Sequence, residues 1–155
     1  MSEHLVRPRI VQLVMALSIA FGAWIDATTP AFTPTGRMTF ARAGHQATLL
    51  LEGRVLVSGG SDNSGNGIAQ AEMFDPVTGT WSGTGTNVIP RVEHAATLLL
   101  DGRVLAVGGV FSSLSSSCST NATAETYDPA TGIWSLTGDL PFVVGSGPIA
   151  ARIPD

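Results

Sequence analysis

The sequence predicts an all-β protein built from two copies of a four-stranded antiparallel unit. Two observations favour this class: one block of β-forming residues occurs twice, and Gly- and Pro-containing turns separate short apolar runs in each copy. Composition agrees, since 18 glycines and only 13% charged residues in 155 suit short strands and tight turns better than a helical bundle. The formal net charge of −4 argues against a nucleic-acid-binding surface, which normally shows clustered Lys and Arg.

The duplication is visible when the chain is compared with itself. His45–Gly60 recurs 49 residues later as His94–Gly109, with 12 of 16 positions identical. Ala71–Gly85 recurs 53 residues later as Ala124–Gly138, with 10 of 15 positions identical. Because the two offsets differ, the length change falls between the blocks and not inside them. This pattern is typical of a repeated structural core with a variable surface loop.

The variable connections are Ser61–Gln70, with ten residues, and Val110–Thr123, with fourteen. They are rich in Ser, Asn and Gly, residues that offer adaptable hydrogen bonding but are equally common in plain solvated loops. In a repeat scaffold, binding residues are expected on such connections and not in the repeated strands.

Each copy is predicted to form four short strands. In the first copy, Ala47–Leu51 and Arg54–Ser58 are β-rich runs joined by Glu52-Gly53, and the counterpart in the second copy is Asp101-Gly102. Asp-Gly between two strands predicts a two-residue hairpin with a type I′ turn, which needs positive φ at both central residues.

A second turn closes each copy. Asp75–Gly79 separates the short runs Glu72–Phe74 and Thr80–Ser82, and Asp128–Gly132 repeats it. Proline sets φ at the start of such a turn and glycine allows the final bend. Four antiparallel strands in a period of about 50 residues correspond to one blade of a β-propeller.

The N-terminus reads as an export signal. Arg7 and Arg9 precede the apolar run Ile10–Ile25, which is short for a membrane-spanning helix but suits a signal peptide. Small residues predict cleavage near residues 20–23. The alternative is an uncleaved membrane anchor formed by residues 10–25.

These blocks resemble kelch repeats, whose hallmarks are an apolar strand that runs into Gly-Gly, then a Tyr or Phe, then a spaced Trp. The residues that carry the resemblance are Gly59-Gly60, Phe74 and Trp81, and again Gly108-Gly109, Tyr127 and Trp134. A leading Arg-x-x-His, Arg42–His45 and Arg91–His94, matches as well. The resemblance implies an incomplete kelch β-propeller of the bacterial exported type, in the superfamily of galactose-oxidase-like central domains.

This organisation divides the chain into five predicted segments. They are a signal peptide or short anchor (1–22), a linker (23–36), kelch repeat 1 (37–85), kelch repeat 2 (86–138) and the degenerate start of a third repeat (139–155).

Propellers usually close with four to eight blades. In this chain the third copy departs from the repeat pattern soon after it begins. The spacing of the first two copies places Arg and His at positions where the chain has Val144 and Gly147. Three accounts remain open: a truncated product, a ring assembled from several copies, or blades supplied by another polypeptide.

The candidate metal-binding and acid–base residues occur at equivalent positions in the two repeats. His45 and His94 occupy one repeat position, which favours a packing and hydrogen-bonding role over metal binding, and His4 leaves with the signal peptide. Glu72 and Glu125 likewise occupy equivalent positions in the two repeats.

For these glutamates a turn-forming or strand-edge role is expected, and the same holds for Asp75 and Asp128. The single cysteine, Cys118, lies in a serine-rich run without a partner for an internal disulfide. Asn121 to Thr123 fits the N-glycosylation pattern on the longer connection.

The resemblance also raises an enzyme alternative, because galactose-oxidase-like enzymes use copper with tyrosine and histidine ligands. The sole tyrosine, Tyr127, stands at the repeat position of Phe74, so packing explains it. The sequence therefore assigns no catalytic, cofactor-binding or metal-ligating residue, and we expect no enzyme activity from this chain.

The predicted function is an exported kelch-repeat binding module, secreted, periplasmic or in the cell envelope. Its expected partner is a protein or carbohydrate bound through the blade loops, with self-association to complete the propeller as a further option. The alternative is a remnant of a larger galactose-oxidase-like or carbohydrate-active enzyme.

Overall fold

The computed structural model describes residues 34–112, 120–144, 147–148 and 150. The chain divides into two units, Met1–Pro34 and Thr35–Asp155, and of the first unit only Pro34 is among the described residues. The predicted N-terminal apolar helix therefore lies outside them. Within the described part of the chain, no helix has the length and apolar character that a membrane crossing requires.

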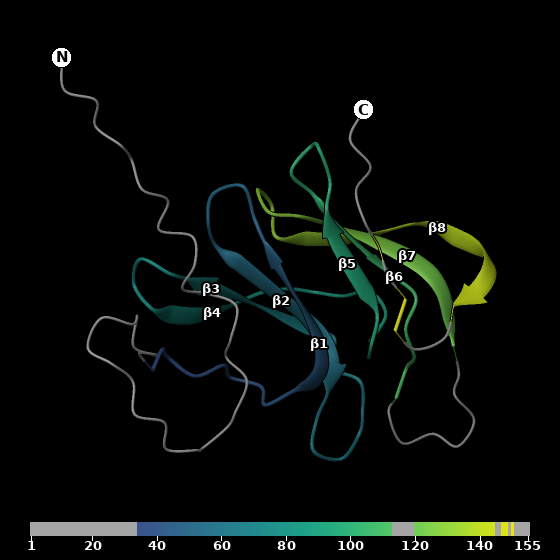
Figure 1. The fold of residues 1–155 in the computed structure, drawn as a ribbon, viewed down its shortest axis with the longest axis horizontal. Coiled ribbons are helices and arrows are strands. Elements are labelled where there is room, and N and C mark those ends of the chain that lie inside the picture. Colours follow the sequence, from purple (N-terminus) through teal and green to yellow (C-terminus); the bar gives the residue numbers. More distant parts are fainter. Residues whose placement is uncertain (1–33, 113–119, 145–146, 149, 151–155) are drawn as a thin grey trace, which may run out of the picture. The chain divides into compact units, whose positions relative to one another are not determined.

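The second unit contains two four-stranded antiparallel sheets, each with its strands in chain order (Figure 1). The first sheet is β1 (Ala43–Leu49), β2 (Val55–Ser61), β3 (Gln70–Asp75) and β4 (Thr80–Thr86). The second sheet is β5 (Ala95–Leu98), β6 (Val104–Val107), β7 (Asn121–Asp128) and β8 (Ile133–Val144). The all-β class and the two four-stranded units predicted from the duplication are confirmed.

The β1–β2 turn differs from the predicted type I′ hairpin. The Gly53 N–H donates to the Leu50 oxygen (3.0 Å), and the Leu50 N–H donates to the Arg54 oxygen (2.9 Å). Gly53 has a φ of 88°, whereas Glu52 is not among the residues with positive φ. The turn is therefore a type I turn followed by a left-handed glycine, a common three-residue hairpin loop.

The second sheet repeats this loop at Leu99, Gly102 and Arg103. The type I′ prediction is wrong in both copies because the strand ends two residues earlier than its apolar run, at Leu49 in β1 and at Leu98 in β5. Leu50 already belongs to the turn, so the loop has three residues and only its last one needs positive φ.

The turns at Asp75–Gly79 and Asp128–Gly132 form as predicted. One carboxylate oxygen of Asp75 accepts the Val77 N–H (2.7 Å), and the Gly79 N–H, at a φ of 70°, donates to the Asp75 carbonyl (2.8 Å). Asp128 does the same for Ala130 (2.9 Å) and Gly132 (2.8 Å). The aspartates thus hold their turns by local side-chain hydrogen bonds.

The core lies between the two sheets. In the first sheet, Leu56 and Met73 are directly opposed on neighbouring strands, so both side chains project from the same face, and both are buried. Opposed residues on the second sheet, Tyr127 and Trp134, project toward them. The cluster comprises Leu50, Leu56, Ala71, Met73, Val104, Ala106, Tyr127 and Trp134.

Gly59 lets the first sheet approach the second copy closely. A Cβ at Gly59 would collide with the Arg91 carbonyl oxygen and lie 2.7 Å from Cε1 of His94. The Gly60 N–H donates to the same Arg91 oxygen (2.8 Å), which joins β2 to the segment that leads into the second sheet. This close approach explains why glycine is needed at Gly59. At Gly60, which has a φ of 90°, a Cβ would lie 2.8 Å from the Ala43 carbonyl oxygen of the first sheet itself.

The aromatic residues of the repeat form matching pairs. The ring centroids of Phe74 and Trp81 are 5.0 Å apart and those of Tyr127 and Trp134 are 5.1 Å apart, each pair tilted by 43°. The second pair packs in the core between the two sheets.

Candidate ligand-binding face

The first variable connection contacts the described start of the second, at Phe111 and Ser112. The order of the strands places the β2–β3 and β6–β7 connections at the same end of their sheets, opposite the β1–β2 and β5–β6 turns (Figure 1). Asn66 forms an antiparallel bridge with Ser112, and the Ser112 hydroxyl donates to the Gly65 oxygen (2.7 Å). A Cβ at Gly67 would collide with the Phe111 carbonyl oxygen. Segments far apart in sequence therefore make one continuous surface.

Asp62 shapes the first connection. One of its carboxylate oxygens accepts the backbone N–H groups of Asn66 (2.9 Å) and Ser64 (2.8 Å), and its carbonyl oxygen accepts the Gly65 N–H (2.9 Å). The Asn66 N–H is the main cause of an Asp62 pKa below the ordinary value, so the carboxylate stays charged at neutral pH. The loop is thus held in one conformation by its own side chain.

A hollow of about 480 Å³, open to solvent, adjoins this connection. Its lining comes from two segments, Thr39–Ala41 and residues of the Asp62–Gln70 stretch. Phe40 is 40% exposed, so an aromatic residue borders a hollow whose lining includes both polar residues, such as Asn63 and Gln70, and the apolar residues Ala41 and Ile68. A ring beside polar groups can stack on one face of a ligand while hydrogen bonds fix its orientation.

A buried ion pair holds the segment that carries Phe40. Glu72 accepts the backbone N–H groups of Thr39 (2.6 Å) and Phe40 (3.3 Å) and forms an ion pair with Arg42 (2.8 Å). Arg42 also donates to the carbonyl oxygens of Gly59 (2.9 Å) and Gln70 (2.8 Å). Burial raises the pKa of Glu72, but these donors outweigh it and hold the pKa below its ordinary value.

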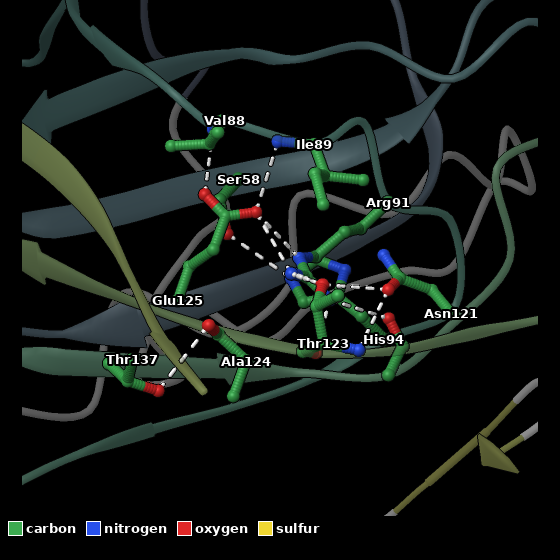
Figure 2. A network of polar contacts seen from close by, with 11 residues as sticks. Ser58, Val88, Ile89, Arg91, His94, Asn121, Thr123, Ala124, Glu125 and Thr137 are labelled. Carbon is green, nitrogen blue, oxygen red and sulfur yellow. Dashed lines mark hydrogen bonds and ion pairs between the residues drawn. The ribbon is translucent and has the colours of Figure 1, made fainter. Parts of the chain in front are cut away.

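The second sheet repeats this ion pair with more bonds (Figure 2). Glu125 accepts the N–H groups of Val88 (2.7 Å) and Ile89 (3.1 Å) and two bonds from Arg91, through Nε (3.0 Å) and Nη2 (2.9 Å). Arg91 also reaches the Thr123 hydroxyl (2.6 Å). Both side chains of the pair are fully buried.

The role expected for the glutamates is therefore wrong. Glu72 and Glu125 lie inside β3 and β7 with no exposed surface, where each fixes the segment leading into its sheet. Sequence reasoning missed Arg42 and Arg91 as their partners, although the repeat equivalence of both members was a usable signal. It also missed Phe40, which has no aromatic counterpart in the second copy, where the position is Ile89.

Of the two repeated histidines, His94 packs at the contact between the sheets. His94 is fully buried, and its Nε2 lies 3.3 Å from the Ser58 hydroxyl on β2. Burial, then the charges of Arg91 and His45, lower the pKa of His94 to about 4, so the ring is neutral at physiological pH. Among the described residues, no group of three or more His, Cys, Asp or Glu side chains gathers as metal ligands do.

Of the remaining candidates, two make hydrogen bonds within the fold and two lie outside the described residues. The Tyr127 hydroxyl bonds to the Thr84 hydroxyl across the two sheets (2.6 Å). Asn121 opens β7 with a buried side chain that accepts the N–H and hydroxyl of Thr123 (2.9 and 2.7 Å), an environment unlike that of an exposed glycan acceptor. His4 and Cys118 lie outside the described residues.

Comparison with known proteins supports the kelch assignment. Residues 42–83 match the family model described as Kelch motif. The first sheet thus carries a kelch motif. No curated protein matches the chain. Among solved structures, the chain is similar to a novel fungal alcohol oxidase with catalytic diversity among the AA5 family, in complex with copper, at 23% identity and a TM-score of 0.46. That match covers 59% of this chain and only 18% of the oxidase.

Proposed function

We propose that the chain is an interaction module of an exported kelch-repeat protein and that it binds its ligand at the face formed by the β2–β3 and β6–β7 connections. The single observation that carries this proposal is the contact between the connections at Asn66, Gly65 and Ser112, which makes one surface from the two segments that the repeats leave variable. Repeat scaffolds hold their function in such segments.

The chemistry of this face fits a polar ligand with one flat apolar patch. Phe40 offers an aromatic ring, and Asn63, Ser64 and Gln70 offer donors and acceptors around the hollow. Both carbohydrates and peptide segments of proteins present this combination. Export is supported by the basic and apolar order of residues 7–25, and no catalytic activity is proposed for the chain.

Binding screens of the full chain against a glycan array and a peptide array test the proposal. We expect a ligand in one of the two, with affinity lowered about tenfold or more by Phe40→Ala, because an aromatic contact contributes on the order of 1 kcal/mol or more. Asp62→Ala, which releases the loop, should weaken the same ligand.

The matched control is Arg54→Ala at the opposite end of the first sheet, where Arg54 pairs with Glu52 on the exposed surface. This variant should bind as the parent chain does. A ligand whose affinity is unchanged by Phe40→Ala and Asp62→Ala, or the absence of any ligand in both arrays, would contradict the proposal.

A further inference from the structure

We propose that Asn66 is a site of spontaneous deamidation and that its conversion opens the contact between the β2–β3 and β6–β7 connections. The modification consumes water and needs no enzyme. The chemistry and the opening of the loop depend only on the contacts of Asn66, whereas an effect on ligand binding rests on the proposed function.

The site is the dipeptide Asn66-Gly67. Among the asparagines of the chain, Asn66 alone is followed by a glycine. Its side chain is exposed. Because glycine has no Cβ, its backbone nitrogen can approach the preceding side chain with little steric hindrance. An exposed asparagine before glycine is therefore the arrangement in which the side-chain amide is attacked most readily by its own backbone.

The reaction is an attack of the Gly67 backbone nitrogen on Cγ of Asn66. The N–Cγ bond forms, the Cγ–Nδ2 bond breaks, and the proton of the Gly67 N–H leaves with Nδ2 as ammonia. Water then opens the cyclic imide without any oxidation or reduction. Opening at Cγ gives aspartate, and opening at the main-chain carbonyl carbon gives isoaspartate, in which the chain continues through Cβ and Cγ.

The other asparagines lack one or both of these features. Asn63 is exposed but precedes Ser64, whose N–H donates to the Asp62 carboxylate (2.8 Å). Asn87 and Asn121 are buried, and both precede residues that have a side chain. We therefore expect Asn66 to convert first.

The fold requires the glycine that makes this site reactive. A Cβ at Gly67 would collide with the carbonyl oxygen of Phe111 and lie 3.0 Å from the Cβ of Pro90. Phe111 belongs to the described start of the second connection, so a larger residue at position 67 would push the two connections apart. The contact between the connections and the reactive dipeptide thus depend on the same residue.

Conversion replaces a hydrogen-bond donor beside Asp62 with a second negative charge. In the unmodified loop, Nδ2 of Asn66 donates to one carboxylate oxygen of Asp62 (3.3 Å), and the Asn66 N–H donates to the other (2.9 Å). After conversion, a carboxylate replaces the amide, and two like charges at this distance repel each other. The repulsion weakens the hold of Asp62 on its own loop.

Isoaspartate also lengthens the backbone by one atom after Cα of residue 66. The Asn66 carbonyl oxygen accepts the Asp62 N–H (2.9 Å), and the Ile68 N–H donates to the Gly60 oxygen (2.7 Å). An extra backbone atom between these two bonds shifts them out of register, so we expect both to weaken. The bridge from position 66 to the second connection should open with them.

Ageing of the purified full chain at several pH values, followed by peptide mapping with mass spectrometry, tests the first part of the proposal. We expect Asn66 to convert to the acid at least about tenfold faster than Asn63, because serine has a Cβ where glycine has none. The rate should rise with pH, since the attacking nitrogen must lose its proton. Equal rates for Asn66 and Asn63 would overturn the proposal.

Hydrogen exchange of the aged chain tests the second part. The N–H groups of Asp62 and Ile68 should exchange faster in the converted fraction, whereas the Gly79 N–H in the β3–β4 turn should keep its rate. Asn66→Gln is the matched control, because its longer side chain disfavours ring closure, and its exchange should not change on ageing. Unchanged exchange at Asp62 and Ile68 in the converted fraction contradicts the proposed opening.

The ligand arrays separate this proposal from the proposed function. A chain that converts at Asn66 and loses protection, but binds no ligand before ageing, would contradict the proposed function alone. A chain that binds a ligand at the proposed face and keeps Asn66 unconverted would overturn the deamidation proposal alone. When both hold, the converted fraction should bind the ligand more weakly than the fresh chain.

Discussion

The two sheets are nearly the same in sequence but not in surroundings, and the difference shows what a repeat determines by itself. Leu56 and Leu105 occupy one repeat position and both follow Gly-Arg-Val, yet Leu56 is 1% exposed and Leu105 is half-buried. Strand pairing and turns follow from the local sequence, and both copies have them. Leu56 is buried because the second sheet covers its face of the first sheet, whereas the equivalent face of the second sheet leaves Leu105 half-buried.

The buried ion pairs differ in a parallel way. Arg91 makes two bonds to Glu125 and one to the Thr123 hydroxyl, whereas Arg42 makes one bond to Glu72. The pair in the second sheet fixes the segment that passes between the sheets, and the pair in the first sheet fixes the segment that carries Phe40. The Arg91–Glu125 pair should therefore contribute mainly to stability, and the Arg42–Glu72 pair mainly to the ligand-binding face.

The largest expected effect comes from Arg91→Met. It leaves Glu125 buried without its cation, which should lower the free energy of unfolding by about 3–5 kcal/mol in urea denaturation. Arg42→Met should cost less, because Arg42 makes fewer bonds. The double variant Arg91→Met/Glu125→Leu should regain part of the loss, and an equal loss for both arginine variants would refute the ranking.

The core leucines test the comparison directly. Leu56→Ala should lower the free energy of unfolding by about 2–5 kcal/mol, because it leaves a cavity between the sheets. Leu105→Ala should cost about 1 kcal/mol, since less buried surface is lost. Similar losses for the two variants would show that the sheets do not pack as described.

The low pKa of His94 predicts that the stability of the folded chain depends on pH, and we expect no comparable contribution from His45. The unfolded chain protonates His94 below about pH 6.5, whereas the folded chain resists protonation until about pH 4. Stability should therefore fall as the pH decreases from 6.5 toward 4, by about 3 kcal/mol in total. Unfolding measured between pH 7 and 5 isolates this effect, because carboxylates titrate mostly below that range.

His94→Gln should flatten this dependence. His45→Gln should leave most of it, because His45 lies on the outward side of the first sheet and is only half-buried. A slope that persists in His94→Gln would assign the titration to another group.

The smallest expected effect is that of the hydrogen bond across the sheets. Tyr127→Phe should cost about 1 kcal/mol, because it removes the bond to Thr84 and keeps the ring in place. Phe74 shows that phenylalanine fits this repeat position. A double-mutant cycle with Thr84→Val should give a coupling of similar size, and no coupling would exclude the bond.

The parts of the fold that could be predicted from the sequence are those that depend on neighbouring residues. The Asp75–Gly79 turn formed as expected because its aspartate, proline and glycine act within five positions. The type I′ prediction failed although it was local, because a single-residue change in where the strand ends alters the loop length and with it the turn type.

The candidate site was less predictable, since its residues meet through tertiary contacts. Glu72 binds Arg42 from thirty positions away, and a lone glutamate in a strand gives no local sign of this. The contact between Asn66 and Ser112 joins two connections that are not repeated, so comparison of the copies could not reveal it. The sequence could therefore predict which connections vary between the copies, but not how these connections contact each other.

The contact between the two connections is the central feature of the proposed binding face, and a disulfide tests it most directly. Asn66 and Ser112 pair as an antiparallel bridge, in which Cα atoms lie about 4.5–5.5 Å apart, within the range of disulfides. Asn66→Cys/Ser112→Cys in a Cys118→Ser background should oxidise to an intramolecular bond detected by mass spectrometry, whereas Asn63→Cys/Ser112→Cys should oxidise poorly. Free thiols or only intermolecular bonds in the first variant would contradict a shared binding face.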